Sequence, residues 1–420
     1  LIRLAGALLT LDGARLFGFD RKATQRSDLL FNSLLSSLGL AHLCSLYAPG
    51  PVATVVLLVA VSWLTLFVSV AMEWAMLRLH GLPCLSLPFV AASIPLCIFF
   101  PIVAHYPPAT SAPFSLLGEP AFLSDEARVF LESFGAIFFA PHAVSGALVL
   151  LALAWRSRLV TCFAIAGYVG GSWLVQLLGV QELAAFRNVF LGFNFLACGI
   201  ALGCVFFIPS WGSLLLAVLG AFFSALIGLA AKALLEPYGI PALAIPFNVA
   251  VLLALAAMRH RVVTSFIPAN VFTHARPEEN LLAHHTLRAR FPDLHVPGLA
   301  PPFYGERVVT QAFDGPVTHR EQWRHALDFE VLDASGTRFT GAGARLEDFH
   351  TFNTPVLAPG DGTVVRVCDQ VEDNAPGRNN LDDNWGNHLV LRLDNGGHAL
   401  LCHFRKGGLL WKIAAEEGYI

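Results

Sequence analysis

An apolar segment with two prolines occurs twice in this chain. Residues 80–90 read HGLPCLSLPFV, and residues 238–248 read YGIPALAIPFN, 158 positions later. A second pair of similar segments begins at Phe31 (FNSLLSSLGLA) and at Phe193 (FNFLACGIALG), 162 positions apart. Because the two pairs keep nearly the same separation, we interpret them as parts of one duplicated unit.

Both copies lie in sequence that suits a lipid bilayer. Acidic and basic residues are sparse in residues 1–260, as expected where each charge near the bilayer centre costs at least about 2.5 kcal/mol. Apolar runs of about 17–25 residues are long enough to cross a membrane. They cover 29–47, 51–78, 86–104, 130–155, 159–180, 189–208, 211–235 and 241–259, and residues 1–19 suggest the remainder of another. The sequence therefore predicts a polytopic α-helical membrane domain over 1–262, with repeat 1 at about 1–105 and repeat 2 at about 128–260.

The paired prolines predict broken helices at matching places in the two copies. Each proline removes a backbone donor and clashes with the preceding helical turn. Broken helices at corresponding positions of two repeats point to the binding site of a membrane transporter. The alternative is that the two segments are proline kinks with no part in a pathway.

The residues that recur in both copies are neutral. They are Phe31 with Phe193, Asn32 with Asn194, and Phe89 with Phe247, whereas no charged residue recurs at a central position. Backbone carbonyls freed at broken helices would accept the N–H groups of a small neutral solute, and ring faces would exclude ions. The other interpretation is that the phenylalanines pack against lipid or against one another.

The motifs L-P-x-L-x-[L/I]-P-F and F-N-x-L, with GAIFFAPHAVSGALV at 135–149, resemble the urea transporter family. The resemblance implies two inverted repeats around a continuous narrow pore, a homotrimer, and passive, channel-like transport. It places Leu35, Phe139 and Ala197 in the pathway beside Phe31 and Phe193. We predict that the pathway also includes Asn32, Ser86, Phe89, Asn194, Ala244 and Phe247. Where the family has threonines, this chain has Ser86 and Ala244, so one hydroxyl remains where two are usual.

From about residue 300 the pattern changes to short strand-like runs separated by glycine- and asparagine-rich turns. We predict a polar linker at 263–304 and a small all-β domain at 305–420. Cys368 and Cys402 fall in this domain, either as a disulfide or as two free thiols. His284, His285, His388 and His398 are expected to face solvent.

The β domain also carries residues that suit zinc. The segment THREQWRHALDF supplies His319, His325 and Asp328, and an imidazole with a carboxylate on adjacent strands can bind Zn²⁺. A further histidine, His403, could stabilise an oxyanion or move a proton. On a regular strand His325 would point away from Asp328, so we favour His319 as the ligand, with His325 as the alternative.

With PVLAPGDGTVVRV, NWGNHLVLRL and ALLCHF, this order resembles the M23 (lysostaphin-like) zinc metallopeptidases, which cut bacterial cell-wall peptides. The resemblance implies a peptidoglycan partner and a catalytic, non-ligand role for His403. That family takes its third ligand from an H-x-H motif that does not occur after His403 in this sequence. We therefore expect a chain that is incomplete at both ends, with zinc not stably bound and no peptidase activity.

Together these patterns predict a urea channel of the bacterial inner membrane with an M23-like domain in the periplasm. The alternatives are a membrane-anchored zinc cell-wall endopeptidase, or a wall-binding sensor with a degenerate peptidase domain. The net charge of −3 says little about partners, and the sequence shows no nucleic-acid-binding pattern, so we expect no nucleic-acid partner.

Overall fold

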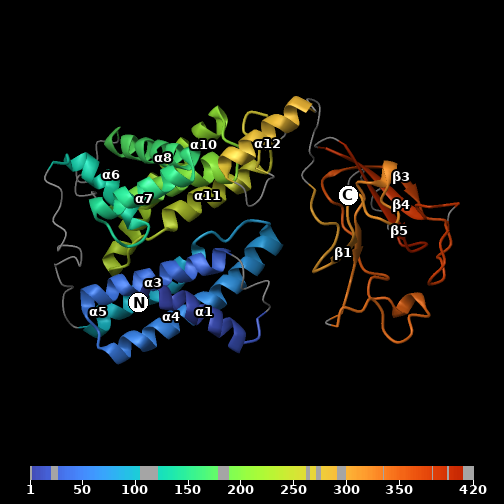
Figure 1. Cartoon of the computed structure of the whole chain (residues 1–420), viewed down its shortest axis with the longest axis horizontal. Coiled ribbons are helices and arrows are strands. Elements are labelled where there is room, and N and C mark those ends of the chain that lie inside the picture. Colours follow the sequence, from blue (N-terminus) through green and yellow to red (C-terminus); the bar gives the residue numbers. More distant parts are fainter. Residues whose placement is uncertain are drawn as a thin grey trace. The chain divides into compact units, whose positions relative to one another are not determined.

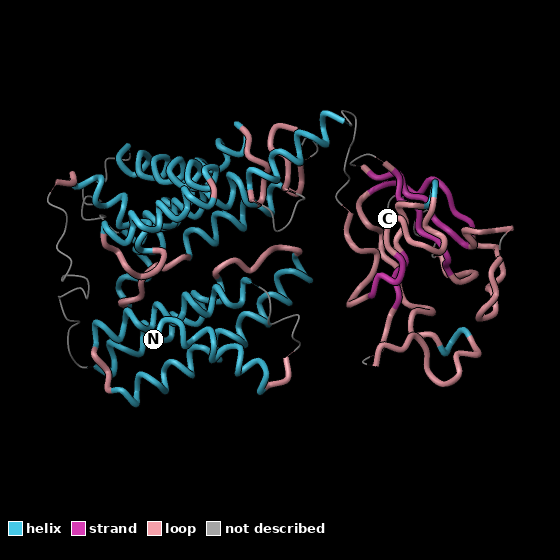
Figure 2. The backbone as a smooth tube through the Cα atoms, in the orientation of Figure 1, coloured by secondary structure: helices cyan, strands magenta, loops and turns pink. Residues whose placement is uncertain are grey.

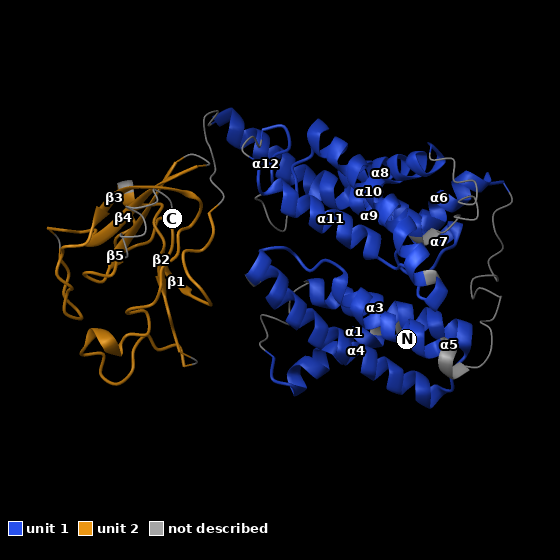
Figure 3. Cartoon of the chain, turned by 180° about the vertical axis from the view of Figure 1, so that it is seen from behind, with its two compact units in different colours: residues 1–290 blue, residues 291–420 orange. Residues whose placement is uncertain are grey.

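The computed structural model of this chain separates into two compact units, residues 1–290 and 291–420 (Figure 3). The residues that the structure describes are 2–19, 27–104, 122–177, 189–261, 265–270, 276–290, 299–333, 335–380, 382–394 and 397–409. Each unit is described by itself below.

The first unit is helical, and its helices form two groups (Figure 1). The first group contains α1 (Ile2–Leu16), α3 (Ser27–Tyr47), α4 (Pro51–Glu73) with the π-helix η1 (Trp74–Leu79) at its end, and α5 (Leu87–Ala104). The second contains α6 (Asp125–Ala136), α7 (Ala143–Arg156), α8 (Arg158–Leu177), α9 (Val189–Ile200) with the π-helix η4 (Ala201–Val205), α10 (Trp211–Leu235) with the 3₁₀ turn η5 (Glu236–Tyr238), and α11 (Ile245–Met258). The segments from Phe31 and from Phe193 lie in α3 and α9, and the two proline segments lead into α5 and α11.

The helices fit a membrane domain. Within the described ranges, four helical stretches are long and apolar enough to cross a bilayer: Asp28–Tyr47, Pro51–Leu77, Arg158–Leu177 and Trp211–Leu235. Shorter apolar helices include Leu87–Phe100 and Ile245–Met258. The last two are short because each begins at one of the proline segments. The predicted helical, membrane-type first domain is confirmed.

The single span predicted over 130–155 is wrong, because the chain breaks between α6 and α7. Phe139 has a φ of 54°, in the left-handed region, and Pro141 has no N–H to continue a helix. The N–H of Ala140 instead returns to the Gly135 carbonyl (3.1 Å). His142 then starts α7 by accepting a hydrogen bond from the Val144 N–H through Nδ1 (3.2 Å).

The predicted linker contains a helix that packs against α8. This helix, α12 (Pro277–Arg290), presents Glu278 to the first turn of α8, where it accepts hydrogen bonds from the Ser157 hydroxyl (2.9 Å) and the Leu159 N–H (3.0 Å). Burial alone would raise the pKa of Glu278, but these hydrogen bonds outweigh it and lower the pKa below its usual value. Ser157 is the N-cap of α8, since its hydroxyl accepts from the Val160 N–H (3.1 Å), and Glu278 supplements this cap from a distant part of the chain.

The second unit is a small β structure (Figure 2). β1 (Val308–Gln311) pairs antiparallel with β2 (Asp328–Glu330), and β3 (Gly362–Cys368), β4 (Asn387–Leu393) and β5 (His398–Phe404) form an antiparallel sheet in that order. Two 3₁₀ turns, η6 (Glu321–Trp323) and η7 (Leu346–Asp348), lie in the loops. Leu389, Leu391 and Leu393 of the central strand form the core.

The order of these strands decides two open points. Cys368 on β3 and Cys402 on β5 are free thiols, because β4 lies between them and two strand spacings of about 4.8 Å exceed the reach of a disulfide. His388 is 5% exposed, so its predicted solvent-facing position is wrong. It lies at the start of the central strand, with its ring 5.1 Å from that of Trp385, whereas His398 on the outer strand β5 is exposed.

Candidate functional site

The two proline segments contain the same strained turn. Leu85 has a φ of 49° and Leu243 a φ of 46°, each two residues before the first residue of its helix, α5 or α11. A left-handed conformation costs a non-glycine residue about 1–2 kcal/mol. Such a conformation persists only where surrounding contacts hold it.

An asparagine from α3 or α9 holds each turn. Asn32 donates through Nδ2 to the Leu85 carbonyl (3.0 Å) and accepts through Oδ1 from the Phe89 N–H (3.1 Å). Asn194 makes the matching pair, to the Leu243 carbonyl (3.0 Å) and from the Phe247 N–H (2.9 Å). Both asparagines are 0% exposed, so these two predicted pathway residues position backbone rather than face open space.

The two segments are joined by a third asparagine. Oδ1 of Asn248, on α11, accepts a hydrogen bond from the Ser86 backbone N–H (3.1 Å), and its Nδ2 donates to Ser86 Oγ (2.9 Å). The same Nδ2 donates to the Ala244 carbonyl (2.7 Å) within its own segment. Sequence comparison of the copies missed Asn248 because the corresponding residue is Val90. The replacement of Val90 by Asn248 in two otherwise similar segments is the sequence feature that could have identified Asn248.

Around this contact lies an apolar group, here called the junction cluster. Its buried members are Leu35, Phe89, Val90, Leu243 and Ala244, and Ile94, Phe139, Phe193, Ile245 and Phe247 pack against them half-buried. The Phe139 ring meets Phe89 edge to face at 5.8 Å and lies 6.0 Å from the ring of His42. The cluster contains no acidic or basic residue, so it offers ring faces and backbone groups but no fixed charge.

The junction cluster includes most of the predicted pathway residues. It brings together Leu35, Phe89, Phe139, Phe193, Ala244 and Phe247. Ser86 is attached to it through Asn248. Phe31 is 46% exposed and lies outside the cluster, as does the half-buried Ala197. The structure therefore does not bring Phe31 and Phe193 together there.

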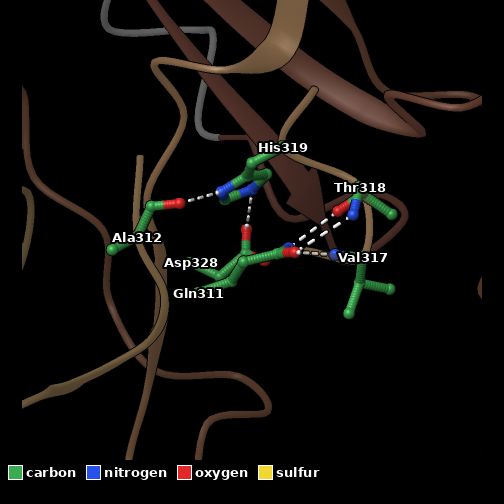
Figure 4. Close-up of polar contacts among 6 residues, drawn as sticks. All are labelled: Gln311, Ala312, Val317, Thr318, His319 and Asp328. Carbon is green, nitrogen blue, oxygen red and sulfur yellow. Dashed lines mark hydrogen bonds and ion pairs between the residues drawn. The ribbon is translucent and has the colours of Figure 1, made fainter. Parts of the chain in front are cut away.

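In the second unit, His319 faces Asp328 (Figure 4). His319 is 4% exposed; its Nε2 lies 3.2 Å from Asp328 Oδ1, and its Nδ1 lies 2.9 Å from the Ala312 carbonyl. Nε2 of Gln311 donates to the other Asp328 oxygen (2.8 Å), and its Oε1 accepts from the Thr318 N–H (3.0 Å). Gln311 thus fixes both the carboxylate and the loop that carries His319.

The other two predicted residues differ in their surroundings. Burial lowers the pKa of His403, while the negative charge of Asp328 acts to raise it, so the two side chains lie within electrostatic reach. His325 is exposed and accepts a hydrogen bond from Arg324 Nε at its own Nε2 (3.1 Å). Of the two alternative ligands, the structure places His319 beside Asp328.

The His319–Asp328 pair fits part of a zinc site. Ligand atoms about 2.1 Å from a tetrahedral zinc ion lie roughly 3.4 Å apart, close to the observed 3.2 Å. The carbonyl partner of Nδ1 would orient the ring as in known sites. Among the described residues, however, no group of three or more His, Cys, Asp or Glu side chains could hold a metal ion. Two ligands are fewer than catalytic zinc requires, so no catalytic step follows from this pair.

A comparison with known protein families identifies the first unit. Residues 1–259 match the urea transporter family, and the match covers α1 to α11, including both proline segments and the junction cluster. It ends before α12 and the β unit. Because the match spans more than half of the chain, the chain belongs to the urea transporter family.

Proposed function

We propose that residues 1–259 form a passive pathway for urea, or a similar small neutral amide, across the bacterial inner membrane. Family membership points to urea and to a membrane. The observation that supports this pathway best is the junction cluster, which is aromatic, uncharged and built from both proline segments. In this proposal the two copies are inverted repeats and the assembly is a homotrimer.

The physical reasoning starts from the solute. Urea is flat and neutral, with N–H donors on two sides and one carbonyl acceptor. Ring faces such as those of Phe139, Phe193 and Phe247 suit a flat solute. They offer nothing that replaces the hydration of an ion, so ions are excluded. A pathway of this kind needs no coupling ion.

The test is urea efflux from proteoliposomes that contain the full chain, followed by stopped-flow light scattering. The expected result is a rate well above that of protein-free liposomes, without an accompanying electrical current. Leu253→Ala should keep the wild-type urea rate, because Leu253 is 61% exposed on α11 and does not belong to the junction cluster. A urea rate equal to that of empty liposomes would refute the proposal.

For the second unit we propose a role at the periplasmic cell wall, with the His319–Asp328 pair as part of a zinc site. The supporting observation is that a buried loop histidine meets a strand carboxylate within ligand distance. When bound, zinc would supply a Lewis acid or an activated water. His319 and Asp328 would hold it, and Gln311 would fix the carboxylate.

The experiment measures zinc per chain by elemental analysis and sedimentation of the protein with purified peptidoglycan. We expect sub-stoichiometric zinc, further reduced in His319→Ala, together with binding to peptidoglycan. Peptidoglycan binding without cleavage would favour a wall-binding sensor, and cleavage would favour an endopeptidase. Identical zinc content in His319→Ala and the unmodified chain would remove the ligand assignment.

A further inference from the structure

The amide of Asn248 has an orientation that its partners determine. Its oxygen faces the Ser86 backbone N–H, which can only donate (3.1 Å). Its nitrogen faces the Ala244 carbonyl, which can only accept (2.7 Å). Exchanging the oxygen and nitrogen would set donor against donor and acceptor against acceptor, so the assignment follows from the partners.

This orientation fixes the role of the Ser86 hydroxyl. The second hydrogen of Asn248 Nδ2 is donated to Ser86 Oγ (2.9 Å), so that oxygen acts as an acceptor and its own hydrogen must point elsewhere. No residue in the described part of the chain accepts a hydrogen bond from the Ser86 hydroxyl. Ser86 is 6% exposed, and a buried donor without an acceptor is unfavourable. The hydroxyl therefore has a free donor at the point where the two segments meet.

The two copies differ at this point. The residue corresponding to Ser86 is Ala244, and the residue corresponding to Asn248 is Val90. The donor and the amide that orients it are therefore a feature of one side of the junction alone.

We propose that Asn248 is a positioning residue that holds the Ser86 hydroxyl as a hydrogen-bond donor toward the transported solute. A donor here binds a carbonyl oxygen, the acceptor of urea and of simple amides. Thiourea has the same flat shape, but its sulfur is a weak acceptor. The site thus selects solutes by their acceptor, and this inference rests on the proposed function because it requires the solute to pass the junction.

The test compares urea flux with thiourea flux in proteoliposomes. Ser86→Ala removes the donor, and Asn248→Val removes the amide that orients it; each substitution introduces the residue found in the other copy. Both variants should lower the urea-to-thiourea flux ratio roughly fivefold, the effect of one hydrogen bond of about 1 kcal/mol. Ser86→Thr keeps the hydroxyl and should keep the ratio.

Ser69→Ala is the control, because Ser69 is 4% exposed on α4 and its hydroxyl has no partner in the described ranges. Its ratio should equal that of wild type. If Asn248→Val slows urea and thiourea equally, Asn248 has a structural role alone and the inference fails while urea transport stands. If wild type carries urea no faster than empty liposomes, the proposed function fails and the inference with it.

Discussion

Replacing Asn32 by leucine should destabilise the membrane domain and slow transport together. The substitution removes the partners of two buried backbone groups, the Leu85 carbonyl and the Phe89 N–H. Each buried group left without a partner costs about 1–3 kcal/mol, so the expected loss is about 2–6 kcal/mol. The bond from Asn32 Nδ2 to the Asp28 carbonyl (2.9 Å) adds little, since it lies within one helix.

The assay is thermal unfolding in detergent micelles, followed by tryptophan fluorescence. A loss of 2 kcal/mol lowers the midpoint by about 4 °C for a domain of this size. Asn194→Leu should give a similar shift, because Asn194 makes the matching bonds to Leu243 and Phe247. Ser33→Ala is the control: Ser33 is equally buried next to Asn32, but its hydroxyl bonds to Leu29 of its own helix (2.9 Å).

Equal midpoints for Asn32→Leu, Ser33→Ala and wild type would refute the reasoning, because the turns would then not depend on the asparagines. A lowered midpoint with unchanged urea flux would show that Asn32 stabilises the domain but does not shape the pathway. Both the unfolding midpoint and the urea flux of Asn32→Leu are expected to fall.

Three further predictions concern other parts of the chain. Phe193→Ala should alter urea flux more than Phe31→Ala, since Phe193 packs in the junction cluster and Phe31 lies outside it. The measurement is urea flux of the two variants in proteoliposomes. The contact of Glu278 with α8 should be fully formed above pH 4.5, the usual pKa of the group, and be lost as the pH falls through the lowered pKa; Glu278→Gln should abolish this dependence in hydrogen exchange of the first turn of α8. Ser335→Ala should raise the pKa of Asp333 from about 2 toward 3.8, because the Ser335 hydroxyl donates to that carboxylate (2.7 Å); carbon NMR titration measures it, and an unchanged pKa would contradict the assignment.

The sequence predicted the features that repeat. Paired prolines at a constant offset predicted broken helices, and the structure shows a left-handed leucine two residues before α5 and before α11. Asn32 and Asn194 stood out because they recur, although their role as backbone partners required coordinates. A residue that recurs in two copies is visible in sequence because both copies obey the same local constraint.

Features that no repeated motif marks were hidden. The break at Phe139 depends on a left-handed φ that its residue type does not indicate. The bond between Asn248 and Ser86 joins residues 162 positions apart, and no local pattern reports such a contact. In the β unit, sequence order placed His319 near Asp328, whereas the burial of His388 follows from the central position of β4 in the sheet.

If solute passes between the two proline segments, a large side chain that fills the junction should block urea flux. Ala244→Trp puts an indole into the junction cluster, where Ala244 is 3% exposed, whereas Leu253→Trp puts the same side chain on the exposed face of α11. Both variants are first checked for a wild-type elution volume and unfolding midpoint. If solute passes through the junction, Ala244→Trp reduces urea flux to the level of empty liposomes and Leu253→Trp retains wild-type flux. Wild-type flux through a folded Ala244→Trp chain would contradict passage through the junction.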